Sequence, residues 1–143
     1  MNLMSTRLLR LAFVVTTGPR AMTRWRWLLT VLVVLVSWLA LSPAPPEEFS
    51  TGWDKLNHAS AFAALTVVGI CSFPRSRGSL LMLLGALLCF GGLIEIAQSF
   101  TPTRSAEWAD LLADLVGMAA GVVLTMLVAR IARVVGQFVF RPE

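Results

Sequence analysis

Four long apolar stretches constrain this chain more than any other feature. They extend over about residues 25–41, 55–73, 79–100 and 110–129. A helix that crosses a bilayer needs about 20 mostly apolar residues. The first stretch is the shortest, but the arginines and tryptophans at 24–27 suit the membrane interface, where their polar ends reach water. The stretches predict an all-α membrane protein with four transmembrane helices.

The composition excludes most soluble classes. Hydrophobic residues make up 57% of the 143 residues and charged residues only 14%, compared with about 25% charged residues in an ordinary soluble domain. The net charge of +4 comes from arginines beside apolar stretches, and no basic tract with interleaved aromatic residues occurs. We therefore expect the lipid bilayer, and not nucleic acid, as a partner. The oligomeric state is left open.

Few residues are available for metal or redox chemistry. Cys71 and Cys89 lie inside apolar stretches and form no CxxC motif, so neither a disulfide nor a zinc site is predicted. His58 is the only histidine, which argues against sites that need several histidines, although a site made of carboxylates alone stays open. No P-loop, nucleophile elbow or HExxH motif occurs. We predict no cofactor and no metal.

The arginines decide the predicted orientation. Five lie before or at the start of the first stretch, two lie between the second and third, and three follow the fourth. The positive-inside rule therefore places both termini in the cytoplasm. The predicted organisation is a basic cytoplasmic tail (1–24), a four-helix membrane domain (25–130) and a basic C-terminal tail (131–143).

Titratable side chains from three of the predicted helices lie at a similar depth near the outer surface. Counted from the nearest interfacial aromatic residue, His58 and Glu95 lie about 7 Å deep and Asp114 about 9 Å deep. Ionisable groups inside a membrane are usually functional and paired. Nine residues form the predicted functional cluster: Asp54, Lys55, His58, Glu95, Gln98, Arg104, Glu107, Asp110 and Asp114.

The spacing of these residues directs them toward neighbouring helices. Three sets share a helix face: Asp54 with His58, Glu95 with Gln98, and Asp110 with Asp114, Gly117 and Gly121. The GxxxG segment from Gly117 to Gly121 predicts close helix packing. Even with Lys55 and Arg104 counted, and before Glu107 is added, the cluster has a formal charge of −2. Either some carboxyl groups are protonated, or a cation or basic ligand group is bound.

Ordered motifs in the same segments resemble the VanZ-like family of small bacterial membrane proteins. DKLNH at 54–58 resembles the family pattern D-K-x-x-H, and EIAQ at 95–98 resembles E-x-x-Q. PTRSAEWAD at 102–110 resembles P-x-R…E-W-x-D, and Gly117 and Gly121 match the glycines that follow. The resemblance covers about residues 27–130. Family members often carry Asn where this chain has Asp114.

The resemblance implies a multi-pass protein of the bacterial inner (cytoplasmic) membrane with a role at the cell envelope. A role in antibiotic resistance is suggested by the resemblance only, because the founding member of the family is linked to teicoplanin resistance. A shared fold does not transfer a function, so the residues themselves have to carry the functional argument.

Structural roles compete with functional ones at several positions. Asp54 and Asp110 begin predicted helices and fit the role of N-terminal caps. Glu95 lies inside a helix, where its structural alternative is a hydrogen bond to Lys55, Gln98 or Arg104. For His58 the alternative is an interfacial histidine, and for Arg104 it is contact with lipid headgroups.

Three functions remain open at this level. The first is binding of an envelope component, such as a cell-wall precursor, a lipid headgroup or a glycopeptide-type compound. The second is an enzyme that uses carboxylate and histidine acid–base chemistry on a lipid-linked substrate. The third is a small proton-coupled transporter. No catalytic residue is assigned from the sequence.

Overall fold

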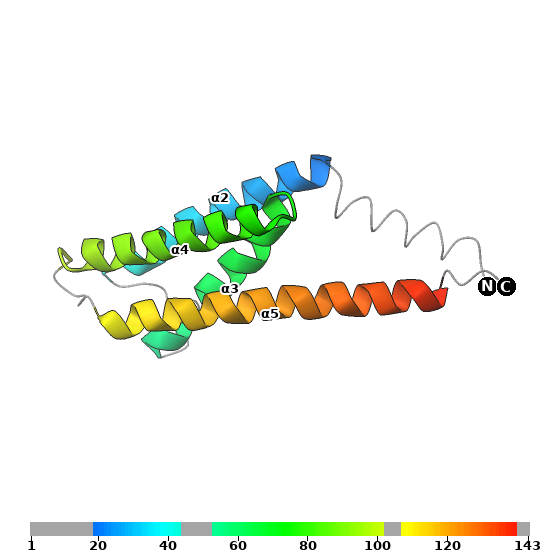
Figure 1. Cartoon of the computed structure of the whole chain (residues 1–143). Helices are drawn as coiled ribbons and strands as arrows, with labels where there is room; N and C mark the ends of the chain where they lie inside the picture. The colour runs from blue at the N-terminus through cyan, green and yellow to red at the C-terminus, as the bar shows by residue number, and fades with distance from the viewer. Residues whose placement is uncertain (1–18, 44–52, 102–106, 140–143) are drawn as a thin grey trace.

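The computed structural model describes residues 19–43, 53–101 and 107–139, and for residues 19 and 136–139 it describes the backbone only. These residues form four α-helices: α2 (Pro19–Leu41), α3 (Asp54–Ser72), α4 (Arg77–Gln98) and α5 (Trp108–Val139) (Figure 1). The predicted all-α fold is confirmed for the described part of the chain. Arg104 and the outer parts of both predicted tails lie outside it.

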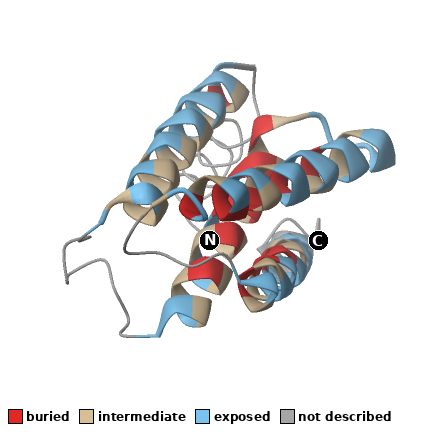
Figure 2. Cartoon of the chain, turned by 90° about the vertical axis from the view of Figure 1, so that its left-hand side faces the viewer, coloured by how far each residue is buried: buried red, intermediate tan, exposed pale blue. Residues whose placement is uncertain are grey.

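Helix α3 occupies the centre of the molecule. It packs against α2, α4 and α5, with its longest contact along α5 (Figure 1). Consecutive helices run in opposite directions. The ends of α2 and α4 therefore meet the starts of α3 and α5 at one end of the molecule (Figure 1). The buried residues, seen from that end in Figure 2, concentrate on α3 and on the faces turned toward it.

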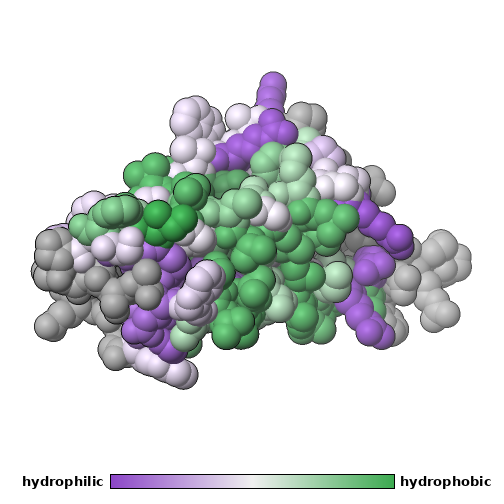
Figure 3. All heavy atoms as spheres, turned by 60° about the vertical axis from the view of Figure 1, so that its left-hand side comes forward, coloured by the Kyte–Doolittle hydropathy of each residue, from purple (hydrophilic) through white to green (hydrophobic). Residues whose placement is uncertain are grey.

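Three helices are long and apolar enough to cross a membrane: Arg20–Leu41, Arg77–Gln98 and Trp108–Val135. The surface agrees with this, since apolar residues cover the middle of the face in Figure 3 and hydrophilic residues lie toward its margins. Helix α3 is not among the three, because its first two turns carry Asp54, Lys55 and His58. The other helices shield much of α3, so it depends less on apolar side chains of its own.

The interior is small, as expected for a protein whose outer surface faces lipid. Its centre consists of five apolar residues from three helices: Phe62, Leu65, Leu83, Leu87 and Met118. Large apolar residues elsewhere on α2, α4 and α5 are exposed, Leu81 and Val116 among them. In water such a surface would aggregate, whereas in a bilayer it meets the lipid chains.

Two glycines of α5 allow the backbones of α3 and α5 to touch. A Cβ atom at position 117 would collide with the carbonyl oxygen of Ala59. A Cβ atom at position 121 would lie 2.7 Å from the carbonyl oxygen of Ala63. The GxxxG spacing thus lies in the contact between α5 and α3, where only a residue without a side chain fits.

The first helix begins earlier than its predicted span. It starts at Pro19 rather than near residue 25, and proline is well placed there because the first turn of a helix needs no N–H partner. Arg26, predicted to reach the interface, instead donates from Nε to the carbonyl oxygen of Ser72 at 3.0 Å. Its guanidinium carbon also lies 5.7 Å from the ring centre of Phe73. Arg26 thereby joins α2 to the end of α3.

The last helix continues beyond its predicted span. It runs to Val139 rather than ending near residue 129. Its 32 residues correspond to about 48 Å, which exceeds the hydrocarbon layer of about 30 Å. The basic residues Arg130 and Arg133 therefore lie on a helical extension of α5, one of the two forms that the sequence left open for this end.

Candidate functional site

The candidate site lies where α3 and α5 begin and α4 ends. Five of its polar side chains are at most 9% exposed although most of the molecule around them is apolar: His58, Glu95, Gln98, Asp110 and Asp114. Burying a charged or polar group without partners is expensive. Their hydrogen bonds therefore decide how the site is built.

Lys55 joins the starts of α3 and α5. Its Nζ atom donates to Oε2 of Glu107 at 2.8 Å and to Oδ1 of Asp110 at 3.3 Å. Glu107 is exposed, whereas Asp110 is only 2% exposed. The contact to Glu107 is a surface ion pair of small value. The contact to Asp110 provides a buried carboxylate with a positive partner.

His58 and Asp114 form a buried pair deeper in the site. Nδ1 of His58 lies 2.9 Å from Oδ1 of Asp114, whose residue is 0% exposed. When Asp114 is ionised its oxygens only accept hydrogen bonds, so in that state Nδ1 of His58 carries the proton and donates it. Oδ2 of Asp114 has no hydrogen-bond partner among the described residues. It lies against Gly91, where a Cβ atom would collide with it.

Glu95 connects the end of α4 to the start of α5. Its Oε2 atom accepts the backbone N–H of Glu107 at 2.8 Å. Its Oε1 atom is buried and has no partner among the described residues. The structural alternative from the sequence was a bond to Lys55, Gln98 or Arg104. The described partner is instead a backbone N–H that precedes α5.

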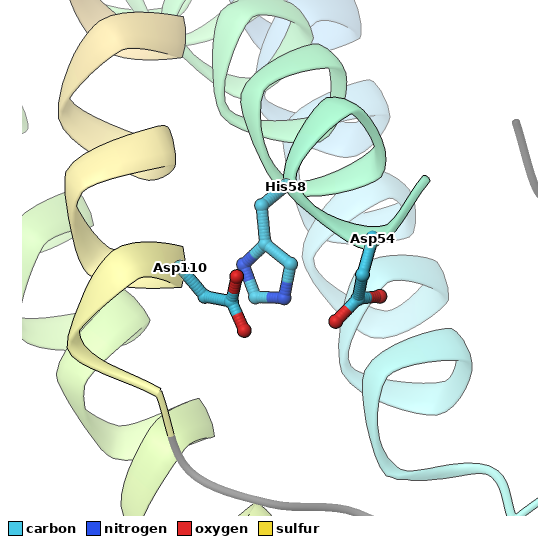
Figure 4. A group of neighbouring side chains, drawn as sticks. All are labelled: Asp54, His58 and Asp110. Carbon is cyan, nitrogen blue, oxygen red and sulfur yellow. The ribbon is translucent and has the colours of Figure 1, made fainter. Parts of the chain in front are cut away.

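Asp54, His58 and Asp110 converge at the mouth of the site. One potential ligand atom from each lies within 4.8 Å of the others. The imidazole ring of His58 lies between the two carboxylate groups in Figure 4, which come from the first turns of α3 and α5. Asp54 is exposed and Asp110 is buried. The sequence predicts no metal site, whereas this geometry offers three ligand atoms of the kinds that bind divalent metals.

The remaining predicted residues have other positions. Gln98 is buried but donates from Nε2 to the carbonyl oxygen of Ala40 at 3.0 Å, so it joins α4 to the end of α2. Arg104 lies outside the described residues. Asp54 is the first residue of α3, whose N-cap is Trp53 without a side-chain hydrogen bond. Asp54 therefore does not occupy the N-cap position, and its negative charge in the first turn suits the helix dipole.

The site carries more acidic than basic groups. Within the described part of the chain it contains five carboxylates, one lysine and one histidine: Asp54, Glu95, Glu107, Asp110, Asp114, Lys55 and His58. At least one oxygen of Glu95 and one of Asp114 are buried without a described partner. The arrangement suits a ligand that supplies positive charge or hydrogen-bond donors, or acid–base chemistry with shared protons.

Two residues of this region were not identified from the sequence. Gly91 provides the space for the carboxylate of Asp114, and its position four residues before Glu95 places it on the same helix face. Thr66 is 0% exposed, and its Oγ1 atom has no described partner. Its Cβ atom lies close to Gly121. The sequence signal for Gly91 is its helical spacing from Glu95, while Thr66 has none.

Comparisons with known proteins agree with this picture. A model of the VanZ/LLP1 family matches residues 8–129. An uncharacterised protein from Schizosaccharomyces pombe is 34% identical over 100 residues, which cover 68% of this chain and 59% of that protein. The chain therefore spans less than two thirds of that relative, which comes from a yeast, so a bacterial inner membrane stays a prediction. No solved structure matches the chain. A family match over most of the sequence, on a molecule with three membrane-spanning helices, shows that this membrane protein belongs to the VanZ/LLP1 family.

Proposed function

We propose that this protein binds an envelope component through the polar site where α3 and α5 begin. The ligand would be a cell-wall precursor, a lipid headgroup or a glycopeptide-type compound. In this proposal α3 is the fourth span, both termini are cytoplasmic, and the site opens to the outer surface of the membrane. The observation that carries the proposal is the cluster of three buried carboxylates at the end of α4 and the start of α5, Glu95, Asp110 and Asp114, of which Asp110 contacts the single lysine of the chain.

The chemistry of the site supports a ligand with both polar and charged groups. Glu95 and Asp114 each hold a buried oxygen without a described partner, and such oxygens accept hydrogen bonds from amines and hydroxyl groups. Lys55 is half-buried at the mouth, where an ammonium group can bind an anionic group. A ligand that donates hydrogen bonds to these oxygens would offset the desolvation cost of burying them.

Neutralising one buried carboxylate is expected to weaken ligand binding. Purified protein in detergent would be titrated with a lipid-linked cell-wall precursor, anionic phospholipid and a glycopeptide, and binding measured by calorimetry. For the true ligand, Glu95→Gln and Asp110→Asn are each expected to raise the Kd by about tenfold or more, because hydrogen bonds to charged groups contribute about 1.5–3 kcal/mol.

Arg133→Gln is the matched control. Arg133 is exposed on α5, about 35 Å along the helix from Asp110, and the substitution also changes the net charge by one. It is expected to bind like the wild type. If none of the three probes binds the wild type, or if both carboxylate variants bind as tightly as the control, the binding proposal fails.

A second candidate function is acid–base catalysis on a lipid-linked substrate. The specific observation is the His58–Asp114 pair, in which a carboxylate orients an imidazole, an arrangement typical of general acid–base catalysts. His58→Gln is then expected to abolish turnover of the lipid-linked probe, measured by mass spectrometry, while binding persists. Binding without turnover by the wild type would leave binding as the function.

The proposed topology predicts the outcome of reporter fusions. Alkaline phosphatase fused after Glu143 is expected to be inactive, because the enzyme matures only outside the cytoplasm. Fusion after Gln98, at the end of α4, is expected to give an active reporter. An active reporter after Glu143 would reverse the proposed orientation and place the site on the cytoplasmic surface.

A further inference from the structure

The mouth of the site has the composition of a divalent cation site. Asp54 and His58 lie one turn apart on α3, and Asp110 lies in the first turn of α5 (Figure 4). Their potential ligand atoms lie within 4.8 Å of one another. We propose that Asp54, His58 and Asp110 bind a divalent cation between α3 and α5. The role of this cation in binding a ligand, argued below, rests on the proposed function.

The contact of His58 with Asp114, which is not one of the three ligands, also supports this assignment. Nδ1 of His58 is 2.9 Å from Oδ1 of Asp114. With Asp114 ionised, the proton is on Nδ1 and the lone pair that a metal would bind is on Nε2. Metal-binding histidines usually donate their second N–H to a carboxylate in this way, which fixes the ring and raises its basicity. Asp114 is 0% exposed and directs Oδ1 at His58, while its Oδ2 atom lies against Gly91 without a described partner.

The charge distribution also favours a cation here. Asp110 and Asp114 are buried on the same face of α5, one turn apart. Glu95 approaches from α4 and bonds the backbone at Glu107, three residues before Asp110. Lys55 is the one lysine at the site, and its contact to Asp110 is the longer of its two bonds. A divalent ion would neutralise carboxylates that a single lysine leaves in excess.

The geometry requires a small movement, and the exposed ligand can provide it. Donor atoms about 2.1 Å from a common ion lie at most about 4.2 Å apart, which is less than the 4.8 Å limit of the cluster. Asp54 is exposed at the first turn of α3, so its side chain can move toward the ion without repacking of the interior. Two carboxylates and one imidazole suit Mn²⁺ or Zn²⁺.

Three protein ligands leave coordination positions open. An ion held by these residues would present those positions toward the exposed side of Asp54, beside Lys55. Anionic oxygens of a headgroup coordinate such an ion readily. In the proposed function the cation therefore connects the acidic site to an anionic ligand group that carboxylates alone would repel.

Mn²⁺ binding to the purified full-length protein tests the cation site directly. Free Mn²⁺ would be measured by electron paramagnetic resonance during titration of the protein in a zwitterionic detergent. The wild type is expected to bind one Mn²⁺, with Zn²⁺ competing.

Asp54→Asn and His58→Gln are each expected to weaken Mn²⁺ binding by about tenfold or more. Asp54→Asn alters an exposed residue and does not threaten the fold. Asp114→Asn, which retains an acceptor for His58, is expected to weaken it by about 10–100-fold. Arg133→Gln is expected to bind like the wild type.

The outcomes separate this inference from the proposed function. If the folded wild type binds no Mn²⁺, or if Asp54→Asn and His58→Gln bind it as tightly as Arg133→Gln, the cation site is wrong. The ligand titrations are then repeated with EDTA and with Mn²⁺. Tighter binding of the anionic probe in Mn²⁺ than in EDTA supports a cation that connects the site to the ligand. Equal binding in Mn²⁺ and in EDTA overturns that role of the cation and leaves the proposed function standing. Mn²⁺ binding without binding of any probe supports the cation site and counts against the proposed function alone.

Discussion

Gly117→Val is expected to destabilise the protein by about 3 kcal/mol, at the upper end of the range for an overpacked interior. A Cβ atom at position 117 would collide with the carbonyl oxygen of Ala59. That oxygen belongs to the backbone of α3, which cannot move aside as the end of a flexible side chain can. Helices α3 and α5 therefore have to separate along their longest contact. The measurement is the free energy of unfolding in detergent, with thermal melting as a second readout.

Gly92→Val on α4 is the matched control. It introduces the same side chain into a helix, and apart from the neighbouring backbone of α4 itself no atom lies within 4 Å of the new Cβ atom. The control therefore measures the change in helix propensity alone, a gain of well under about 1 kcal/mol because valine forms helices better than glycine. Equal melting of the two variants would show that α3 and α5 do not make the close contact. Ala59 follows His58 directly, so Gly117→Val is also expected to weaken ligand binding.

Asp114→Leu is expected to lower the free energy of unfolding by about 1–3 kcal/mol, the cost of a buried donor without a partner. Leucine has the same branched shape as aspartate, with two methyl groups in place of the oxygens, and offers no acceptor. The Nδ1–H group of His58 would then lose its partner at 2.9 Å in a place that water does not reach, since Asp114 is 0% exposed. The measurement is again unfolding in detergent.

Asp114→Asn separates the hydrogen bond from the charge. Its amide oxygen can accept the same N–H group, so the stability of this variant is expected to stay within about 0.5 kcal/mol of the wild type. Hydrogen bonds between membrane helices average about 0.6 kcal/mol. A loss of that size or less in Asp114→Leu would show that His58 finds another partner or is not buried beside Asp114.

The polar turn of α3 shows where prediction from the sequence reaches its limit. The apolar stretches predict four helices, and the described part of the chain forms four. Three of them carry enough apolar surface to cross a membrane on their own. Helix α3 depends on its neighbours, because α2, α4 and α5 pack against it and His58 in its second turn is buried. Hydropathy is calculated from one segment of the sequence, whereas the shielding of a helix from lipid depends on all the helices packed around it.

The helix ends show a related limit. Proline stops and starts a helix by local chemistry, and Pro19 does begin α2. The length of an apolar stretch, however, predicts how much of a helix lies in lipid. It does not predict how far the backbone hydrogen bonds of the helix continue. Helix α5 therefore continues past the apolar stretch to Val139, through basic residues that are themselves good helix formers.

The sequence by itself determined the helices, their membrane character and the residues that bring polar groups to one end of the molecule. Spacing of three and four residues was sufficient for this, because side chains at those intervals share a helix face. Only the tertiary structure decided which of these groups meet. It pairs His58 with Asp114 and Lys55 with Asp110, and it directs Gln98 away toward α2. The physical reason is that two side chains on different helices meet only at the right crossing angle and relative height of those helices. The close contact at Gly117 fixes both for α3 and α5, whereas residue spacing within one helix fixes neither.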